Sequence, residues 1–564
     1  MNGLIMMLAA VAVLGAGYFF YGRWLAKTWG VDPKAATPAY ELRDGVDYEP
    51  ADTPVVFGHQ FASIAGAGPI NGPIQAAVFG WVPVFLWILV GGVFFGAVQD
   101  FSAMYASVKN KGRTIGYIIE EYIGKLGKKL FLLFCWLFCI LVVAAFSDIV
   151  AETFNGFTAD GERIAANGSV AATSMLFIIE AVGLGLLLRF SRLNKCVNTL
   201  IAVALLAAGV AAGLAFPLYV ASETWHIIIF IYIMIASVVP VWALLQPRDY
   251  LNSYLLIFMI LGSVVGILFT NPAINLPAFT SFAVEGTGNM FPILFVTIAC
   301  GAVSGFHSLV SSGTASKQIK NEKHMLPVSF GAMLLESLLA VIALIAAASF
   351  ASGEAAAAGY STPAQLFAGG VANFLTTLGL PHGVVFKLVN LAVSAFALTS
   401  LDSVARVGRL SFQELFLDVS VNDDKMEPWR RVLTNKYFAT ALTLLLAYLL
   451  TKIGYRNIWP LFGSANQLLS VLALVACAVY MKKTSRKGWM LWAPMVVMLC
   501  VTFTALTQKM VALISAPTAG NILQLAFAAA LFVLGMIVVV LGFRRLAADK
   551  AVRRTPSRAE GSDR

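Results

Sequence analysis

Four polar residues that could handle protons or cations lie in one otherwise apolar stretch, and they are Ser304, His307, Ser308 and Ser311. On a single helix, their spacing of i, i+3, i+4 and i+7 places the four side chains along one stripe. Hydroxyl oxygens can bind a cation, and an imidazole exchanges a proton near neutral pH. We predict an ion-coupling face here, because a histidine at membrane depth indicates a function. For each single serine, a bond to its own helix or packing at a small-residue interface remains the alternative.

Acidic residues in other apolar stretches could exchange the same proton. Glu180 and Glu336 lie near the middle of such stretches, where exposing a charged side chain to lipid costs about 3 kcal/mol. Each of them must therefore be neutral, paired or directed into a cavity. Asp100 lies nearer the end of its stretch. We predict that Asp100 and Glu336 take part in ion coupling together with His307.

Three further ionisable residues, His59, Lys387 and Asp402, lie near the ends of apolar stretches. His59 and Asp402 could extend a proton path, or they could simply reach the water interface. Lys387 could also reach the interface, or its cation could attract a carboxylate substrate. The sequence leaves these alternatives open.

A run of glycine and proline interrupts the second apolar segment, and Ser63, Gly66, Ala67, Gly68 and Pro69 lie at its centre. A continuous helix is not expected there. In lipid, freed backbone groups are tolerated only where protein or a water-filled cavity satisfies them. Freed amides and the N-terminus of a half-helix carry partial positive charge, which suits a carboxylate. We predict that these five residues bind the substrate.

A second interruption is expected at Pro240, inside the apolar segment 226–245. Proline removes a helical hydrogen bond and clashes with the preceding turn. We predict that Pro240 and Trp242 close the site from the opposite side, with the Trp242 ring as a packing surface. A simple kink at Pro240 is the alternative.

The elements that must position these residues are membrane helices. Hydrophobic residues make up 59% of the 564-residue chain, charged residues make up 12%, and the mean hydropathy is +0.81, far from the average of soluble proteins. With about 20 apolar residues per span, the sequence predicts an all-α polytopic membrane protein with about fifteen transmembrane helices. The expected spans are 3–21, 58–80, 83–107, 129–153, 171–190, 195–219, 226–245, 252–270, 290–313, 326–351, 383–402, 437–452, 460–481, 489–508 and 521–543.

The basic residues predict the orientation of these spans. Cytoplasmic loops hold most Lys and Arg residues in membrane proteins. With the N-terminus outside and the C-terminus inside, cytoplasmic segments and the helix ends beside them hold 34 of the 39 basic residues. A miscounted helix would scramble this alternation. The net charge of +10 follows from the same distribution, so it gives no reason to expect a nucleic-acid partner.

Other motifs that would indicate a cofactor or an enzyme are missing from the sequence. The six cysteines form no C-x-x-C pair, and the five histidines form no zinc signature. No Walker A sequence indicates ATP as the driving force. We therefore expect no metal, no cofactor and no enzymatic activity. The expected partners are a small-molecule substrate, a coupling proton or sodium ion, and the lipid bilayer.

Several blocks of this sequence occur in an order that resembles the carbon starvation protein family, CstA, of bacterial inner-membrane transporters. The blocks are GHQFASIAGAGPINGP, GAVQDF, WALLQPRDYLNSY, ACGAVSGFHSLVSSGT, LTSLDSVARVGRL and LFGSANQLL. The chain differs in having His59 and Gln60 where many members have two adjacent histidines, and it is shorter than the long enterobacterial forms.

The resemblance implies uptake of peptides or pyruvate during carbon starvation, coupled to protons. It also implies a fold similar to the amino acid-polyamine-organocation superfamily, with two inverted five-helix repeats whose first helices are broken. If the span 58–80 is the first helix of this fold, the second repeat begins with the span 226–245, which contains Pro240. On this basis we expect an extra N-terminal helix and cytoplasmic lead-in (1–57), a transporter core (58–402), a cytoplasmic loop with four additional helices (403–543) and a basic cytoplasmic tail (544–564).

Two other functions remain open from the sequence. A sodium-coupled amino acid transporter would use the same fold, because a fold does not set the substrate. A membrane-embedded enzyme or sensor is the second alternative, although no metal-ligand spacing, nucleophile motif or sizeable soluble domain supports it.

Overall fold

The computed structural model describes all residues except 1, 45–47, 159, 191–194, 240–243, 352, 417–426 and 548–564. Within the described residues, ten helices are long and apolar enough to cross a membrane, and three shorter apolar helices accompany them. The chain is therefore a multi-pass α-helical membrane protein, as its composition predicts.

The helices of the first half follow one another with short connections. They are α1 (Gly3–Ala16), η1 (Gly17–Gly22), α2 (Arg23–Trp29), α3 (Pro38–Glu41), α4 (Thr53–Ile64), α5 (Gly68–Ala76), η2 (Ala77–Phe79), α6 (Trp81–Gly91), η3 (Gly92–Gly96), α7 (Ala97–Lys109), α8 (Ile115–Tyr122), α9 (Lys125–Phe154), α10 (Ala165–Phe190), α11 (Lys195–Ala215), α12 (Ser222–Val238) and α13 (Leu245–Thr270).

The second half opens with a small antiparallel hairpin and is otherwise helical. Its elements are β1 (Ala283–Val284), β2 (Gly288–Asn289), α14 (Met290–Thr297), α15 (Gly305–Gly313), η5 (Ala315–Lys317), η6 (Glu322–His324), η7 (Leu326–Gly331), α16 (Ala332–Ala348), α17 (Glu354–Ala357), α18 (Pro363–Thr376), α19 (His382–Phe416), α20 (Pro428–Leu433), α21 (Lys436–Thr451), α22 (Tyr455–Lys483), η9 (Trp489–Leu491), α23 (Trp492–Ser515) and α24 (Ala519–Ala547).

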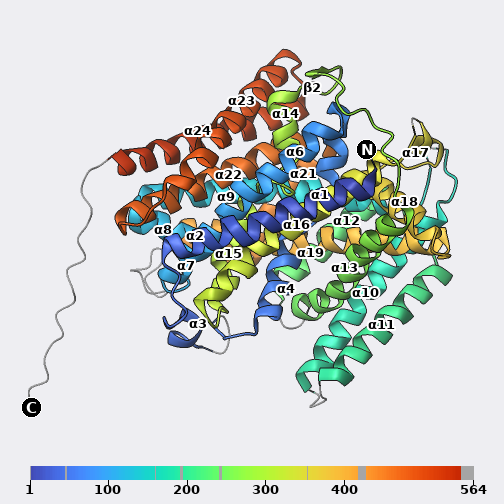
Figure 1. Cartoon of the computed structure of the whole chain (residues 1–564), viewed down its shortest axis with the longest axis horizontal. Helices are drawn as coiled ribbons and strands as arrows, with labels where there is room; N and C mark the ends of the chain where they lie inside the picture. Colours follow the sequence, from blue (N-terminus) through green and yellow to red (C-terminus); the bar gives the residue numbers. More distant parts are fainter. Residues whose placement is uncertain are drawn as a thin grey trace, which may run out of the picture.

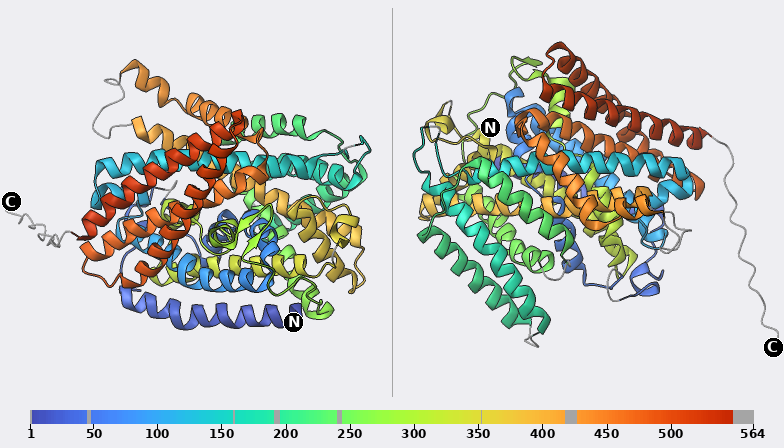
Figure 2. Two further views of the ribbon diagram at one scale, coloured as in Figure 1. Left: turned by 90° about the horizontal axis from the view of Figure 1, so that it is seen from above. Right: turned by 180° about the vertical axis from the view of Figure 1, so that it is seen from behind.

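Two long helices, α9 and α19, pack against each other at the centre of the bundle. Helix α22 packs on α9 and is covered in turn by α23 and α24, whereas α10 and α11 form a hairpin at the side (Figure 1). Figure 2 shows α1 at the outer edge of the bundle. Helix α1 begins on the side of α17 and α18, and α24 ends on the opposite side, near α8 (Figure 1).

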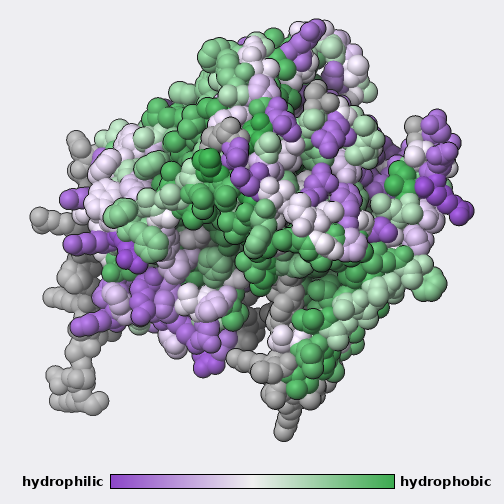
Figure 3. Space-filling view, turned by 45° about the vertical axis from the view of Figure 1, so that its right-hand side comes forward, coloured by the Kyte–Doolittle hydropathy of each residue, from purple (hydrophilic) through white to green (hydrophobic). Residues whose placement is uncertain are grey.

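The surface of the molecule agrees with a membrane environment. Figure 3 shows hydrophobic side chains spread broadly over the middle of one face, while hydrophilic side chains gather towards opposite sides. Large apolar residues on α10, α11, α23 and α24 are exposed, among them Ile179, Leu200, Val511 and Val533. In lipid such exposure carries no penalty, because the lipid tails are as apolar as these side chains.

The break expected in the second apolar segment is confirmed. Helix α4 ends at Ile64, because Ala65 leaves the helical region with φ −78° and ψ 60°. Helix α5 begins at Gly68, and Pro69 lies in its first turn, where the missing N–H of proline has no helical partner to lose.

The continuous helix expected over 290–313 is wrong. Helix α14 ends at Thr297, and α15 begins only at Gly305, after an extended Ser304. Ser304 therefore lies before the helix, so the predicted four-residue stripe is reduced to His307, Ser308 and Ser311. The segment 298–304 contains small residues and no proline, so hydropathy alone gave no sign of this break.

The second interruption, expected at Pro240, lies outside the described residues, as does Trp242. The described residues before it show that α12 ends at Val238 and that Val239 is extended, which is usual for a residue preceding proline. The boundary expected after residue 402 falls inside α19, which continues to Phe416.

Candidate functional site

The two broken helices pack against each other at their breaks. Glycine makes this approach possible, because a Cβ atom at Gly68 would collide with the Cys300 side chain. A Cβ atom at Gly72 would lie 2.6 Å from the carbonyl oxygen of Thr297. The two unwound segments, which are far apart in sequence, therefore lie side by side.

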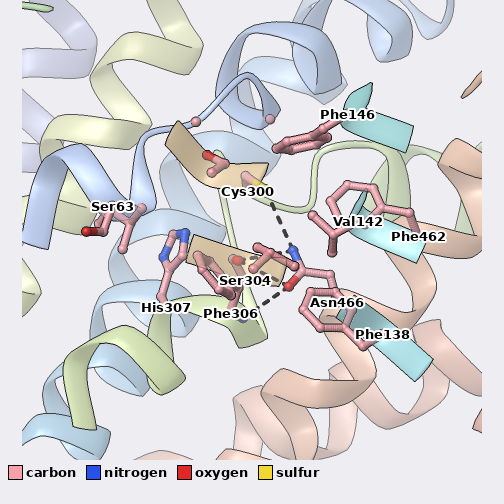
Figure 4. Close-up of a pocket in the computed structure, with 15 residues that line it drawn as sticks. Ser63, Phe138, Val142, Phe146, Cys300, Ser304, Phe306, His307, Phe462 and Asn466 are labelled. Atoms are coloured by element: carbon pink, nitrogen blue, oxygen red, sulfur yellow. Dashed lines mark hydrogen bonds between the residues drawn. The ribbon is translucent and has the colours of Figure 1, made fainter. Parts of the chain in front are cut away.

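A cavity with about 340 Å³ of empty space lies beside the two breaks (Figure 4). Both broken helices contribute to its wall, and α9, α19 and α22 complete it. The lining residues are Ser63, Ile64, Gly66, Gly68, Phe138, Val142, Phe146, Cys300, Ser304, Phe306, His307, Ser400, Val404, Phe462 and Asn466. An apolar wall with a few polar groups at one side is typical of sites for small molecules.

Of the residues predicted to bind substrate, Ser63, Gly66 and Gly68 line this cavity. Ala67 and Pro69 are buried in the same break. Pro69 lies beside the second break, because its Cα atom would be 3.8 Å from a Cβ atom placed at Gly301. At the first break, Ser63, Gly66 and Gly68 therefore line the cavity, and Pro69 lies against the second break.

Helix α22 satisfies backbone groups that the second break leaves free. The Gln467 amide donates to the Phe295 carbonyl at 2.5 Å, and the Trp459 indole donates to the Thr297 carbonyl at 3.4 Å. On the other side of the break, Asn466 Oδ1 accepts from the Phe306 amide at 3.1 Å. These bonds pair three of the backbone groups beside the unwound segment 298–304, as groups at membrane depth require.

Three predicted ion-coupling residues from three helices form one cluster. His307 Nδ1 on α15 lies 3.1 Å from Asp100 Oδ2 on α7, and His307 Nε2 lies 3.3 Å from Glu336 Oε2 on α16. Their side chains are at most 1% exposed. Because His307 also lines the cavity, the uptake or loss of one proton in this cluster changes the charge beside the cavity by one unit.

The predicted serines have different surroundings. Ser304 lines the cavity and bonds to Asn466. Ser308 donates to the Gly305 carbonyl at 2.6 Å within its own helix, which is the alternative left open for it. Ser311 accepts a hydrogen bond from Gln60 Nε2 at 2.8 Å and so connects α15 to α4.

Two other buried ionisable groups are paired far from the cluster. Asp402 is fully buried, forms an ion pair with Arg248 and accepts from Tyr232 Oη at 2.7 Å, so it does not reach the interface. Asp148 Oδ1 lies 2.8 Å from Nε2 of His226. Both pairs join helices that are distant in sequence.

Sequence reasoning missed several lining residues, including Cys300, Ser400 and Asn466. The aromatic side chains of Phe138, Phe146 and Phe462 had no signal that set them apart from other apolar residues. Asn466 did have a signal in the sequence. A carboxamide in the middle of an apolar stretch raises the free energy of the membrane-inserted helix unless the carboxamide is hydrogen-bonded.

Comparison with known proteins places this arrangement in a family. The family model described as "Carbon starvation protein CstA" matches residues 2–357 and 349–505. The chain belongs to the CstA family. It is 34% identical to "Peptide transporter CstA" of Escherichia coli K12, over 90% of this chain and 81% of the relative. It is 31% identical to "Pyruvate/proton symporter BtsT" of the same organism, over 90% of this chain and 82% of the relative.

Among solved structures, the chain is similar to a manganese transporter mutant, H236A, from Eremococcus coleocola. The TM-score is 0.47 and the sequence identity is 10%, and the match covers 87% of this chain and 96% of the other. Among the described residues, no group of three or more His, Cys, Asp or Glu side chains could hold a metal ion.

Proposed function

We propose that this CstA-family protein is a secondary transporter that imports small carboxylate-bearing nutrients, peptides or pyruvate, across the bacterial inner membrane in symport with protons. The observation that carries the proposal is the buried Asp100–His307–Glu336 cluster beside a cavity between two broken helices. The names of the relatives, which include a peptide transporter and a pyruvate/proton symporter, support the same function. The family name supports a role in carbon starvation.

In the proposed mechanism, the substrate occupies the cavity and the proton occupies the cluster. The carboxylate lies against the small residues of the first break, where Gly66 and Gly68 allow close approach to the backbone. A proton on the cluster reduces its negative charge by one unit. Because like charges repel strongly in a medium of low dielectric constant, protonation favours anion binding, and the two ligands are carried together.

We further propose that the helices form the expected two inverted repeats, with a changed assignment of the second. The first repeat contains α4–α5, α6–α7, α9, α12 and α13, and the second contains α14–α15, η7–α16, α19, α21 and α22. Packing supports this assignment, because α9 contacts α21 and α22 while α19 contacts α12 and α13. The second repeat then begins at 290 instead of 226.

Ten long helices, three shorter apolar helices and the two broken helices support the expected fifteen spans. The proposed orientation has the N-terminus outside and the C-terminus inside. The start of α1 and the end of α24 lie on opposite sides of the molecule (Figure 1), in agreement with an odd number of spans.

Uptake by purified protein in proteoliposomes tests the proposed function. We expect labelled pyruvate or a di- or tripeptide to accumulate when the outside is made acidic, in buffer without sodium. Collapse of the gradient with a protonophore should abolish the accumulation. Uptake that depends strictly on sodium would instead favour the sodium-coupled alternative.

A further inference from the structure

Asn466 lies in the middle of α22, the most enclosed apolar helix of the described chain. The side chain is fully buried, and it lines the cavity opposite Cys300 (Figure 4). A polar side chain at this depth must be bonded to protein or ligand. Among the described lining residues, Asn466 has the sole carboxamide, and a carboxamide can both donate and accept.

The bonds of Asn466 resemble those that a bound carboxylate would make. Its Oδ1 accepts from the backbone amide of Phe306 at 3.1 Å and lies 3.2 Å from the Ser304 hydroxyl. Its Nδ2 donates to Ser304 Oγ at 3.0 Å and lies 3.7 Å from Cys300 Sγ. Asn466 Oδ1 thus takes two donors at the wall of the cavity, and Nδ2 of the same side chain donates to Ser304 Oγ and to Cys300 Sγ.

We infer that Asn466 contacts the substrate carboxylate and sets the affinity of the cavity for it. A carboxylate oxygen replaces Asn466 Oδ1 as the acceptor for Phe306 and Ser304, and Asn466 Nδ2 then donates to the same carboxylate. The Phe306 amide, the Ser304 hydroxyl and Asn466 Nδ2 all keep an acceptor in the bound state, while Asn466 Oδ1 gives up its two donors to the carboxylate. The inference rests on the proposed function and adds a substrate-contacting residue on α22 to the two breaks.

Cys300 provides a measurement of occupancy in the full-length protein. Cys300 forms no disulfide, its residue is partly buried, and it is part of the cavity wall. We expect N-ethylmaleimide to alkylate Cys300 in the empty transporter, and pyruvate or a dipeptide to slow this reaction. Mass spectrometry of the digested protein locates the modification, so the remaining cysteines can stay in place. We call the concentration of pyruvate or dipeptide that halves the alkylation rate the half-protecting concentration.

The decisive variant is Asn466→Asp. An aspartate has almost the same shape and keeps the acceptor for Phe306 and Ser304, but it replaces the amide donor by a negatively charged oxygen. We expect the half-protecting concentration to rise about 10- to 100-fold, the loss that corresponds to a hydrogen bond to a charged group. Asn457→Asp makes the same substitution at an exposed position of α22, and it should leave protection unchanged.

The outcomes separate this inference from the proposed function. If neither pyruvate nor peptides protect Cys300 in the wild-type protein, the cavity is not the substrate site and the inference is refuted, whereas the proposed function fails only if proteoliposomes show no proton-driven uptake. If the wild-type protein is protected and Asn466→Asp is protected at the same concentrations, the role of Asn466 is refuted while the cavity stands. Should Asn466→Asp fail to insert, Asn466→Ser removes the amide without adding charge. An unchanged half-protecting concentration in that variant would equally overturn the inference.

Discussion

At the scale of single residues, His307 lies between the cavity and two carboxyl groups, and we propose that its side chain carries the coupling proton. Nδ1 lies beside Asp100 and Nε2 lies beside Glu336. Imidazole exchanges protons in the physiological range without a large perturbation. The separation of these three residues in the chain means that folding, and not local sequence, builds the cluster.

We predict that His307→Gln weakens proton-driven accumulation at least about tenfold but reduces substrate exchange much less. Glutamine can keep one hydrogen bond to a carboxyl group, but it cannot take up a proton. Accumulation under an imposed pH gradient and counterflow without a gradient measure the two activities. His382→Gln, at the start of α19, is the matched control and should resemble wild type. A His307→Gln protein that accumulates substrate normally and requires sodium would overturn proton coupling through this cluster.

At the scale of elements, the close packing of the two broken helices depends on glycine. We predict that Gly68→Leu abolishes uptake while insertion into the membrane is retained, because the new side chain would occupy the space of Cys300. Membrane fractionation and proteoliposome uptake measure the two properties. If the Gly68→Leu protein inserts into the membrane and takes up substrate at the wild-type rate, the first break is not part of the substrate site.

The best control for this variant is Gly183→Leu on α10, where no atom lies within 4 Å of a Cβ position. A scaffold glycine such as Gly213 is unsuitable, because its Cβ would lie 2.7 Å from the backbone nitrogen of Thr173. Gly183→Leu should retain uptake.

A smaller substitution measures the packing energy at a neighbouring contact between the same two broken helices. Gly72→Ala places a methyl group against the Thr297 carbonyl, and overpacking of this kind costs about 1–3 kcal/mol. We expect a lower thermal unfolding temperature in detergent, while Gly183→Ala should leave the temperature within error of wild type. Equal unfolding temperatures for both variants would show that the breaks can separate without cost.

At the scale of the whole molecule, the distribution of basic residues predicts the orientation in the membrane. Reporter fusions after Asp160 and Glu354 should score periplasmic, and fusions after Lys320 and at the C-terminus should score cytoplasmic. Glu354 begins α17, which lies on the side of the molecule where α1 begins (Figure 1). If fusions at both ends of the chain report the same side, the count of fifteen spans is contradicted.

The sequence by itself determined the membrane class, most helix positions and the first break. The hydropathy of a segment is the sum over its own residues, and glycine and proline change the conformation of the backbone at their own positions. Both signals are therefore local in the sequence. The second break was decided by tertiary structure, because 298–304 has no proline and α22 binds backbone groups beside it. The same is true of the cluster and of Asn466. Asp100 and Asn466 meet residues that are more than 150 positions away, and no local pattern encodes which distant side chain meets a given one.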